Sequence, residues 1–225
     1  MDRPKLDNPI WYSLEELQKE YGIDYGTARF YDPAYCSFGG FVDYHNLELH
    51  IDKYAQLTNS FFIVGDEPIY SDQIRIEEDL VCDQFILDEP VELNYTEDII
   101  ALDNDFHKSN LFDLILEVFP GFFMKRTADL GRYFGIYKNN RLVAVTGERL
   151  RMNGYTEVSA VVTHPDYTRK GYAQQLVAYT SNAIFEDNCY PYLHTASGNY
   201  KAIGVYRKLG FRLRRKISFW KLTKK

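Results

Sequence analysis

The sequence's clearest candidate for binding chemistry is a short basic turn, Arg169-Lys170-Gly171. It follows a β-branched run at residues 158–163, which is typical of a half-buried strand, and it precedes apolar residues with helical spacing from Ala173 onward. A strand, a glycine turn and a helix N-terminus in this order present free N–H groups and the positive end of the helix dipole to an anion. We therefore expect this turn to bind the pyrophosphate of a cofactor.

The elements that must position this turn alternate between helix and strand from residue 91 onward. Helices are expected over about residues 97–108 and 111–118, after the turn to about residue 186, and over residues 199–209. Strands are expected at residues 91–94, 133–137, 142–150, 157–163, 190–195 and 211–222. The resulting order, βααβββαβαβ, predicts an α/β fold in which helices pack on a sheet.

Residues 1–90 differ from the remainder of the chain in charge and in pattern. They hold 6 lysines and arginines against 19 aspartates and glutamates, whereas residues 91–225 hold 20 against 13. Short strands are expected here, one of them at residues 47–51, after a helix that begins at the capping box Ser13-Leu14-Glu15-Glu16. We therefore divide the chain into an acidic, β-rich N-terminal region of unknown role (1–90) and an α/β domain (91–225). On one interpretation, the acidic first part attracts a cationic substrate and the basic second part attracts a polyphosphate ligand. On the other, the two oppositely charged parts only complement each other.

Composition excludes several classes of function for these 225 residues. The net charge of −6 argues against a nucleic-acid partner. No apolar run approaches the roughly 20 residues that span a membrane, and the first residues lack the apolar stretch of a secretion signal. Three distant cysteines predict reduced thiols in a cytoplasmic protein, and the histidines lack the spacing of metal ligands, so no metal is expected. The oligomeric state cannot be read from these patterns.

The order of elements and two sequence blocks resemble the GNAT superfamily of acetyl-CoA-dependent N-acetyltransferases. The turn of that family follows Q/R-x-x-G-x-G/A, which residues 168–173 match at Gly171 and Ala173, with Thr168 at the first position. The second block matches at Asn199, Ala202, Tyr206, Gly210 and Phe211. The resemblance covers about residues 91–220 and implies a GNAT-like mixed central sheet flanked by helices. Residues 1–90 would be either a β-rich extension or a second, smaller and degenerate copy.

The resemblance also implies that acetyl-CoA is the cosubstrate and that three stretches hold it. The pyrophosphate would lie on the backbone of Arg169, Lys170, Gly171, Tyr172 and Ala173. The backbone of Val161, Val162 and Thr163 would pair with the pantetheine arm. Asn199 and Ala202 would contact the cofactor from the start of the last helix, and a simple N-capping role for Asn199 is an equal alternative.

Two residues are expected to move protons while an acetyl group passes directly to an amine. Glu157 would take a proton from the ammonium form of the acceptor, directly or through water, with Glu148 as the rival base. A buried position would raise the pKa of Glu157 and make it a better base near neutral pH. Tyr206 would donate a proton to the leaving thiolate, and its alternative role is a core tyrosine.

The function expected from these residues is N-acetyl transfer from acetyl-CoA to a small-molecule or peptide amine whose identity the sequence does not specify. Two alternatives belong to other classes of protein. The domain could bind CoA as a regulatory module without catalysis, or residues 1–90 could form a protein-interaction module on a transferase scaffold.

Overall fold

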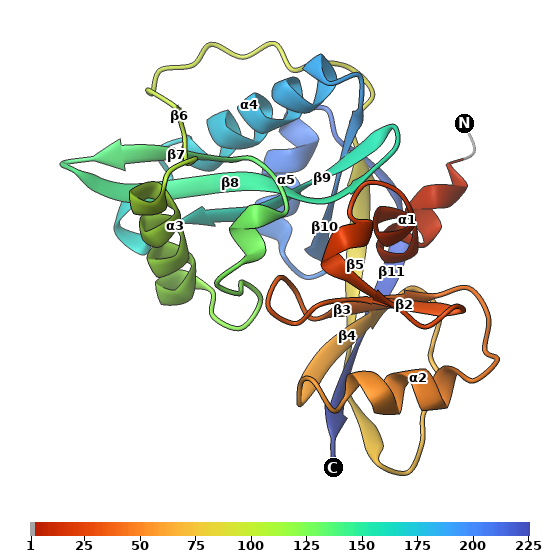
Figure 1. Ribbon diagram of the computed structural model, residues 1–225. Coiled ribbons are helices and arrows are strands. Elements are labelled where there is room, and N and C mark those ends of the chain that lie inside the picture. The colour runs from red at the N-terminus through yellow and green to blue at the C-terminus, as the bar shows by residue number, and fades with distance from the viewer. Residues whose placement is uncertain (1–2) are drawn as a thin grey trace.

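Eleven strands form one mixed sheet in the computed structural model, which describes residues 3–225 (Figure 1). Their order across the sheet is β1-β2-β3-β4-β11-β5-β10-β9-β8-β7-β6. Helices pack on both faces, so the predicted α/β architecture, a mixed central sheet flanked by helices, is confirmed.

Each part of the chain contributes a run of strands to this sheet. The first part contains α1 (Pro9–Glu15), β1 (Gly22–Asp24), β2 (Ala28–Tyr31), β3 (Phe38–Phe41), α2 (Leu47–Tyr54), β4 (Ser60–Val64) and β5 (Ile74–Ile86). The second part contains β6 (Ile100–Ala101), α3 (Asp105–Val118), β7 (Tyr133–Lys138), β8 (Arg141–Met152), β9 (Tyr155–Thr163), α4 (Tyr172–Glu186), β10 (Tyr190–Ala196), α5 (Tyr200–Lys208) and β11 (Arg212–Lys224). Short 3₁₀ helices lie at Pro4–Asp7, Lys19–Tyr21, Thr127–Asp129 and Pro165–Tyr167.

The two long strands β5 and β11 cross between the two parts of the chain. β5 comes from the acidic first part but lies between β10 and β11, antiparallel to both. β11 ends the chain but lies between β4 and β5. Their mutual register runs from Arg212 opposite Ile86 to Lys224 opposite Ile74. Each part therefore completes the sheet of the other.

The strand order repeats on the two sides of the β11–β5 pair. β1, β2 and β3 form an antiparallel meander, as do β7, β8 and β9. After each meander a helix, α2 or α4, crosses to a strand that is parallel to the last strand of the meander. We propose that the first part is a shortened second copy of the same fold, and that the boundary between the copies falls near residue 90.

Helices α3 and α4 cover opposite faces of β7, β8 and β9. Neighbouring residues of a strand point to opposite faces, and β7 follows this rule. Tyr133 packs with Leu111 and Leu114 of α3, whereas Phe134 packs with Leu176 of α4. Within residues 3–225, no helix combines the length and the apolar character needed to cross a membrane.

Two predicted elements of the first part are wrong. Residues 47–51 belong to α2 and not to a strand, because Leu47, Ile51 and Tyr54 are buried at helical spacing against the sheet. The first helix begins at Pro9 and not at Ser13. Asn8 precedes it and accepts a hydrogen bond from the N–H of Trp11, so an asparagine cap and a proline at the first helical position define the start.

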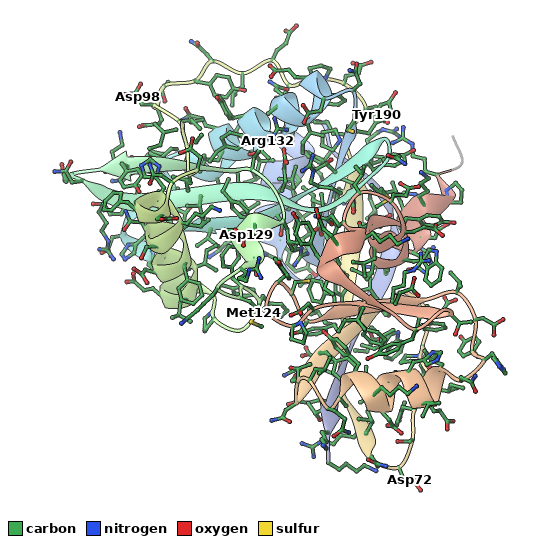
Figure 2. The ribbon with its side chains drawn as sticks, in the orientation of Figure 1. Asp72, Asp98, Met124, Asp129, Arg132 and Tyr190 are labelled. Carbon is green, nitrogen blue, oxygen red and sulfur yellow. The ribbon has the colours of Figure 1, made fainter. Side chains whose placement is uncertain are left out.

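Residues 91–94 are not a strand and residues 97–108 are not one helix. Residues 87–99 instead run across α4 as an extended segment, on which Figure 2 labels Asp98. Side chains of α4 hold this segment: Gln175 Oε1 accepts from the N–H of Thr96 at 2.8 Å, and Asn182 bonds the backbone of Val91. These partners are distant in sequence, so hydrophobic spacing could not reveal them.

Candidate active site

Strands β9 and β10 are paired over only three residues of each. Tyr155, Thr156 and Glu157 lie opposite Tyr190, Pro191 and Tyr192. Beyond them β9 stays with β8 and β10 stays with β5, so the facing edges diverge. A cavity of about 670 Å³ opens at this divergence. An unpaired strand edge beside a cavity provides N–H and C=O groups that an extended ligand can bond.

Five of the predicted site residues border this cavity. Val161, Val162 and Thr163 contribute from β9, and Asn199 and Tyr206 contribute from the start and the middle of the second sequence block. The structure therefore brings together residues that are about 40 positions apart in the sequence. Ala202 and the turn at residues 169–173 do not border the cavity.

A β-bulge turns the backbone of β9 toward the cavity. Gly147 lies opposite Ser159 and Val145 opposite Val162, so β9 carries one extra residue in this interval. Ala160 within the bulge has φ 51°, a left-handed conformation that costs a non-glycine residue about 1–2 kcal/mol. Nearby, the hydroxyl of Thr163 is buried without a hydrogen-bond partner in residues 3–225. The bulge interrupts the regular pairing of β9 with β8 where β9 borders the cavity.

The turn that was predicted to bind an anion leaves its backbone N–H groups without protein partners. Arg169 and Gly171 have positive φ values of 62° and 78°, and Gly171 precedes α4 as a cap without any side-chain hydrogen bond. Among the backbone and side-chain hydrogen bonds of residues 3–225, none uses the N–H groups of residues 169 to 174. Six free N–H groups at the start of a 15-residue helix suit an anion.

The side chains of the turn have separate tasks. Thr168 donates its hydroxyl hydrogen bond to the carbonyl of Pro165, so this residue closes the turn locally. The side chain of Tyr172 is buried among Phe134 and Leu176, so only its backbone faces the turn. Arg169 and Lys170 are exposed and add positive charge.

Glu157 lies at the last position at which β9 pairs with β10, and its side chain is almost completely buried. Arg149 donates to its two carboxylate oxygens at 2.8 and 2.9 Å, and Nδ1 of His194 lies 2.8 Å from Oε1. Burial alone raises the pKa of Glu157, but the charge of Arg149 and the hydrogen bonds from His194 and Arg149 together lower it to about 2. The expected rise in this pKa is therefore wrong. Arg149 and His194 border the cavity, whereas Glu157 lies behind them.

The protonation of His194 follows from its partners. Gln84 Oε1 accepts from Arg214 at 2.9 Å, so the amide nitrogen of Gln84 faces both the carbonyl of Leu6 and Nε2 of His194. His194 must accept at Nε2 and donate from Nδ1 to Glu157. The histidine is therefore neutral, with its proton on Nδ1.

Glu148, the rival base, lies on the opposite face of the sheet from Arg149. It is fully buried and pairs with Arg132, which also bonds Asp187 and the carbonyl of Ala183 on α4. Figure 2 shows Arg132 beside this helix. Glu148 thus stabilises the contact between β8 and α4 and does not border the cavity.

Tyr206 combines a buried ring with a hydroxyl that borders the cavity. Its ring packs near Phe85 and Phe211, and burial raises its pKa to about 12. The hydroxyl forms no hydrogen bond with any residue that the structure describes. Tyr206 therefore stays protonated at neutral pH and can donate to a ligand.

Asn199 combines both of the roles considered for it. Its Oδ1 accepts from the N–H of Ala202 at 3.2 Å, which makes Asn199 the N-cap of α5. The residue also borders the cavity. Ala202 is half-buried and packs on the same cluster as Tyr206.

The wall of the cavity next to Arg149 and His194 was not predicted from the sequence. It includes Phe38 of β3 and Cys82 of β5 from the first part, with Phe122 from the segment after α3. That segment, on which Figure 2 labels Met124, is attached to the first part through hydrogen bonds from Arg126 and Thr127. No local pattern marks these residues, because only the exchange of strands brings them together.

Residues 3–225 contain no cluster of three or more histidine, cysteine, aspartate or glutamate side chains that could hold a metal ion. The thiols of Cys36, Cys82 and Cys189 are all free. Burial raises the pKa of Cys82 to about 12, so its thiol is protonated at neutral pH and is a poor nucleophile.

Comparison with known proteins agrees with this geometry. The model of the FR47-like protein family matches residues 133–220. A GNAT-family protein from Novosphingobium aromaticivorans is 31% identical, with 100% of both chains covered and a TM-score of 0.90. A GCN5-related N-acetyltransferase from Kribbella flavida is 16% identical over 96% of this chain and 93% of that one, with a TM-score of 0.65. The latter shows likeness of fold alone. The comparison with curated proteins found no match.

The fold, a mixed sheet flanked by helices, is that of an acyltransferase. The chain belongs to the GNAT family of acetyltransferases.

The ion pair of Glu157 predicts a specific loss of stability in acid. Its folded pKa of about 2 lies below the ordinary value of 4.5, so the stabilisation is complete above pH 4.5 and is lost as the pH falls toward 2. The loss is on the order of 3 kcal/mol. We expect Glu157→Gln to remove this part of the acid dependence, as measured by urea unfolding at pH 7 and pH 3. Equal acid sensitivity of the two proteins would contradict the assignment.

Proposed function

We propose that the protein transfers an acetyl group from acetyl-CoA directly to a primary amine of a small molecule or peptide. The observation that carries this proposal is the cavity between β9 and β10, on which an unpaired strand edge and the hydroxyl of Tyr206 converge. We further propose a cytoplasmic location, which the three free thiols support.

The residues present fit acetyl-CoA at three points. The free N–H groups of residues 169 to 174 would hold the pyrophosphate, with Arg169 and Lys170 beside it. The backbone of Val161, Val162 and Thr163 would pair with the amides of the pantetheine arm. Asn199 would contact the cofactor from the facing side of the cavity. When bound, acetyl-CoA supplies a thioester carbonyl that an amine can attack.

The amine must lose a proton before its nitrogen can form the new bond to the acetyl carbon. A carboxylate with a pKa of about 2 is a weak acceptor, so we favour a route in which water takes the proton. Glu157 is paired with Arg149 and does not border the cavity, so its part in this step would be to hold Arg149 and His194 in place beside the water. Of the two routes considered for Glu157, we therefore propose the one through water.

The bond from carbon to sulfur breaks as the amide forms. The nitrogen loses one of its two remaining protons to water, and the sulfur gains a proton. The hydroxyl of Tyr206 has no protein partner, so its proton is free to bond the sulfur as negative charge develops there. Solvent would restore the proton to the tyrosine afterwards. Cys82 borders the same cavity but is protonated, which favours direct transfer over an acetyl-cysteine intermediate.

A CoA-binding module without catalysis is the alternative function, and a thiol-release assay distinguishes the two. We expect free thiol to appear when the protein is incubated with acetyl-CoA and a panel containing a polyamine, an amino acid, an aminoglycoside, an arylalkylamine and a peptide. Tight binding of acetyl-CoA, with no thiol released for any member of the panel, would favour the module.

The anion site can be tested with Gly171→Glu. The substitution places a carboxylate among the free N–H groups and strains a residue at positive φ, so we expect acetyl-CoA binding by calorimetry to be lost. Gly26→Glu is the matched control, because Gly26 is also exposed and has φ 88° with open space around it. Normal binding by the Gly171 variant would place the pyrophosphate elsewhere.

The proton donor can be tested with Tyr206→Phe. We expect kcat to fall by roughly 100-fold, because the sulfur would leave without its proton, while the dissociation constant of acetyl-CoA stays nearly constant. Tyr200→Phe serves as control, since Tyr200 lies on the same helix, is 80% exposed and does not border the cavity. Unchanged turnover in the Tyr206 variant would remove it from this role.

A further inference from the structure

The cavity continues past Arg149 and His194 into a wall built from aromatic side chains. The guanidinium of Arg149 lies 4.7 Å from the ring centre of Phe38, and the ring of His194 lies 5.3 Å from that of Phe219. Phe122 and Phe123 contribute from the segment after α3. Because this wall lies beyond the residues assigned to the cofactor, it faces the space that an acceptor would occupy.

The charge around the cavity restricts what can enter it. Among the residues that the structure describes, two lysine or arginine side chains border the cavity, Arg149 and Lys201, and no carboxylate does. An acceptor with several ammonium groups would lose water in this space without gaining a counter-charge, which is unfavourable. The acidity of the first part therefore does not extend to this cavity, where Phe38, Leu80 and Cys82 present apolar surface.

The rings in this wall form a stack that is open at one end. Phe62 and Phe122 have ring centres 5.4 Å apart with planes 25° apart, and Phe122 and Phe119 are 5.1 Å apart with planes 15° apart. Phe62 is buried among core residues from both parts of the chain, and Phe122 is the middle ring of the stack. Phe119 is 55% exposed and borders the cavity, so its outer face is the open end. Parallel rings at this separation provide flat apolar faces suited to another aromatic ring.

We propose that the acceptor is a primary arylalkylamine, with one amino group on an uncharged aromatic body. Its ring would lie against the outer face of Phe119, at the open end of the stack, and its amino group would lie toward Tyr206. This rests on the proposed function and names the substrate class for it. It also assigns a task to the first part of the chain, which supplies one side of the acceptor wall through β3 and β5.

The test compares 2-phenylethylamine, n-butylamine and spermidine as acceptors in the thiol-release assay with acetyl-CoA. We expect kcat/KM for 2-phenylethylamine to exceed the other two by at least roughly tenfold. Phe119→Ala should raise the KM for 2-phenylethylamine by roughly tenfold and leave the dissociation constant of acetyl-CoA unchanged. Phe106→Ala is the matched control, because Phe106 is a 66% exposed phenylalanine of α3 that does not border this cavity. Phe119→Leu replaces the alanine variant if circular dichroism shows that the latter is unfolded.

Three outcomes would overturn the inference. Spermidine or n-butylamine used as well as 2-phenylethylamine would show that the aromatic wall does not select the acceptor, while the transferase function would stand. If octanoyl-CoA is preferred to acetyl-CoA, and Phe119→Ala alters the KM for octanoyl-CoA but not for the amine, the wall holds a longer acyl chain. If no amine releases thiol although acetyl-CoA binds, the proposed function itself fails.

Discussion

The short pairing between β9 and β10 is the constraint on which the site depends. Pairing stops at Glu157 and Tyr192 because each strand then follows a different neighbour, β8 on one side and β5 on the other. The bulge at Ala160 carries β9 further out of register, and a cavity opens where a regular sheet would be closed. Continued pairing would leave the strand edge without free backbone groups for a pantetheine arm.

The point of divergence is held by a buried ionic network. Arg149 and Glu157 form a two-point ion pair, and the neutral His194 connects that pair through Gln84 to Arg214 on β11. A buried charge is tolerated only when its partners are complete, and these partners come from β8, β9, β10, β5 and β11. The exchange of β5 and β11 thus does more than complete the sheet, because it supplies the hydrogen bonds that fix the charges beside the cavity.

Local chemistry explains which parts of the site could be predicted from the sequence. The turn at residues 168–173 and the block from Asn199 to Phe211 depend on residues close together in the chain, and their backbone geometry follows from a glycine and a helix cap. The direction of the shift in the pKa of Glu157 was predicted wrongly, because its partner Arg149 lies eight residues away across a hairpin. The extended segment at residues 87–99 was missed because side chains of α4 satisfy its backbone.

The sequence by itself determined the fold class, the glycine turn before α4 and the helix that carries Tyr206, because the hydrophobic spacing and the caps of these elements are local. Only the tertiary structure decided what surrounds them. The exchanged β5 carries Leu80, Cys82 and Gln84 to the cavity, and β3 carries Phe38 there, from a part of the chain whose acidic composition suggested a different role. Hydrogen bonds and packing between residues far apart in the sequence select the partner of a strand. A local sequence pattern therefore does not predict which strands pair.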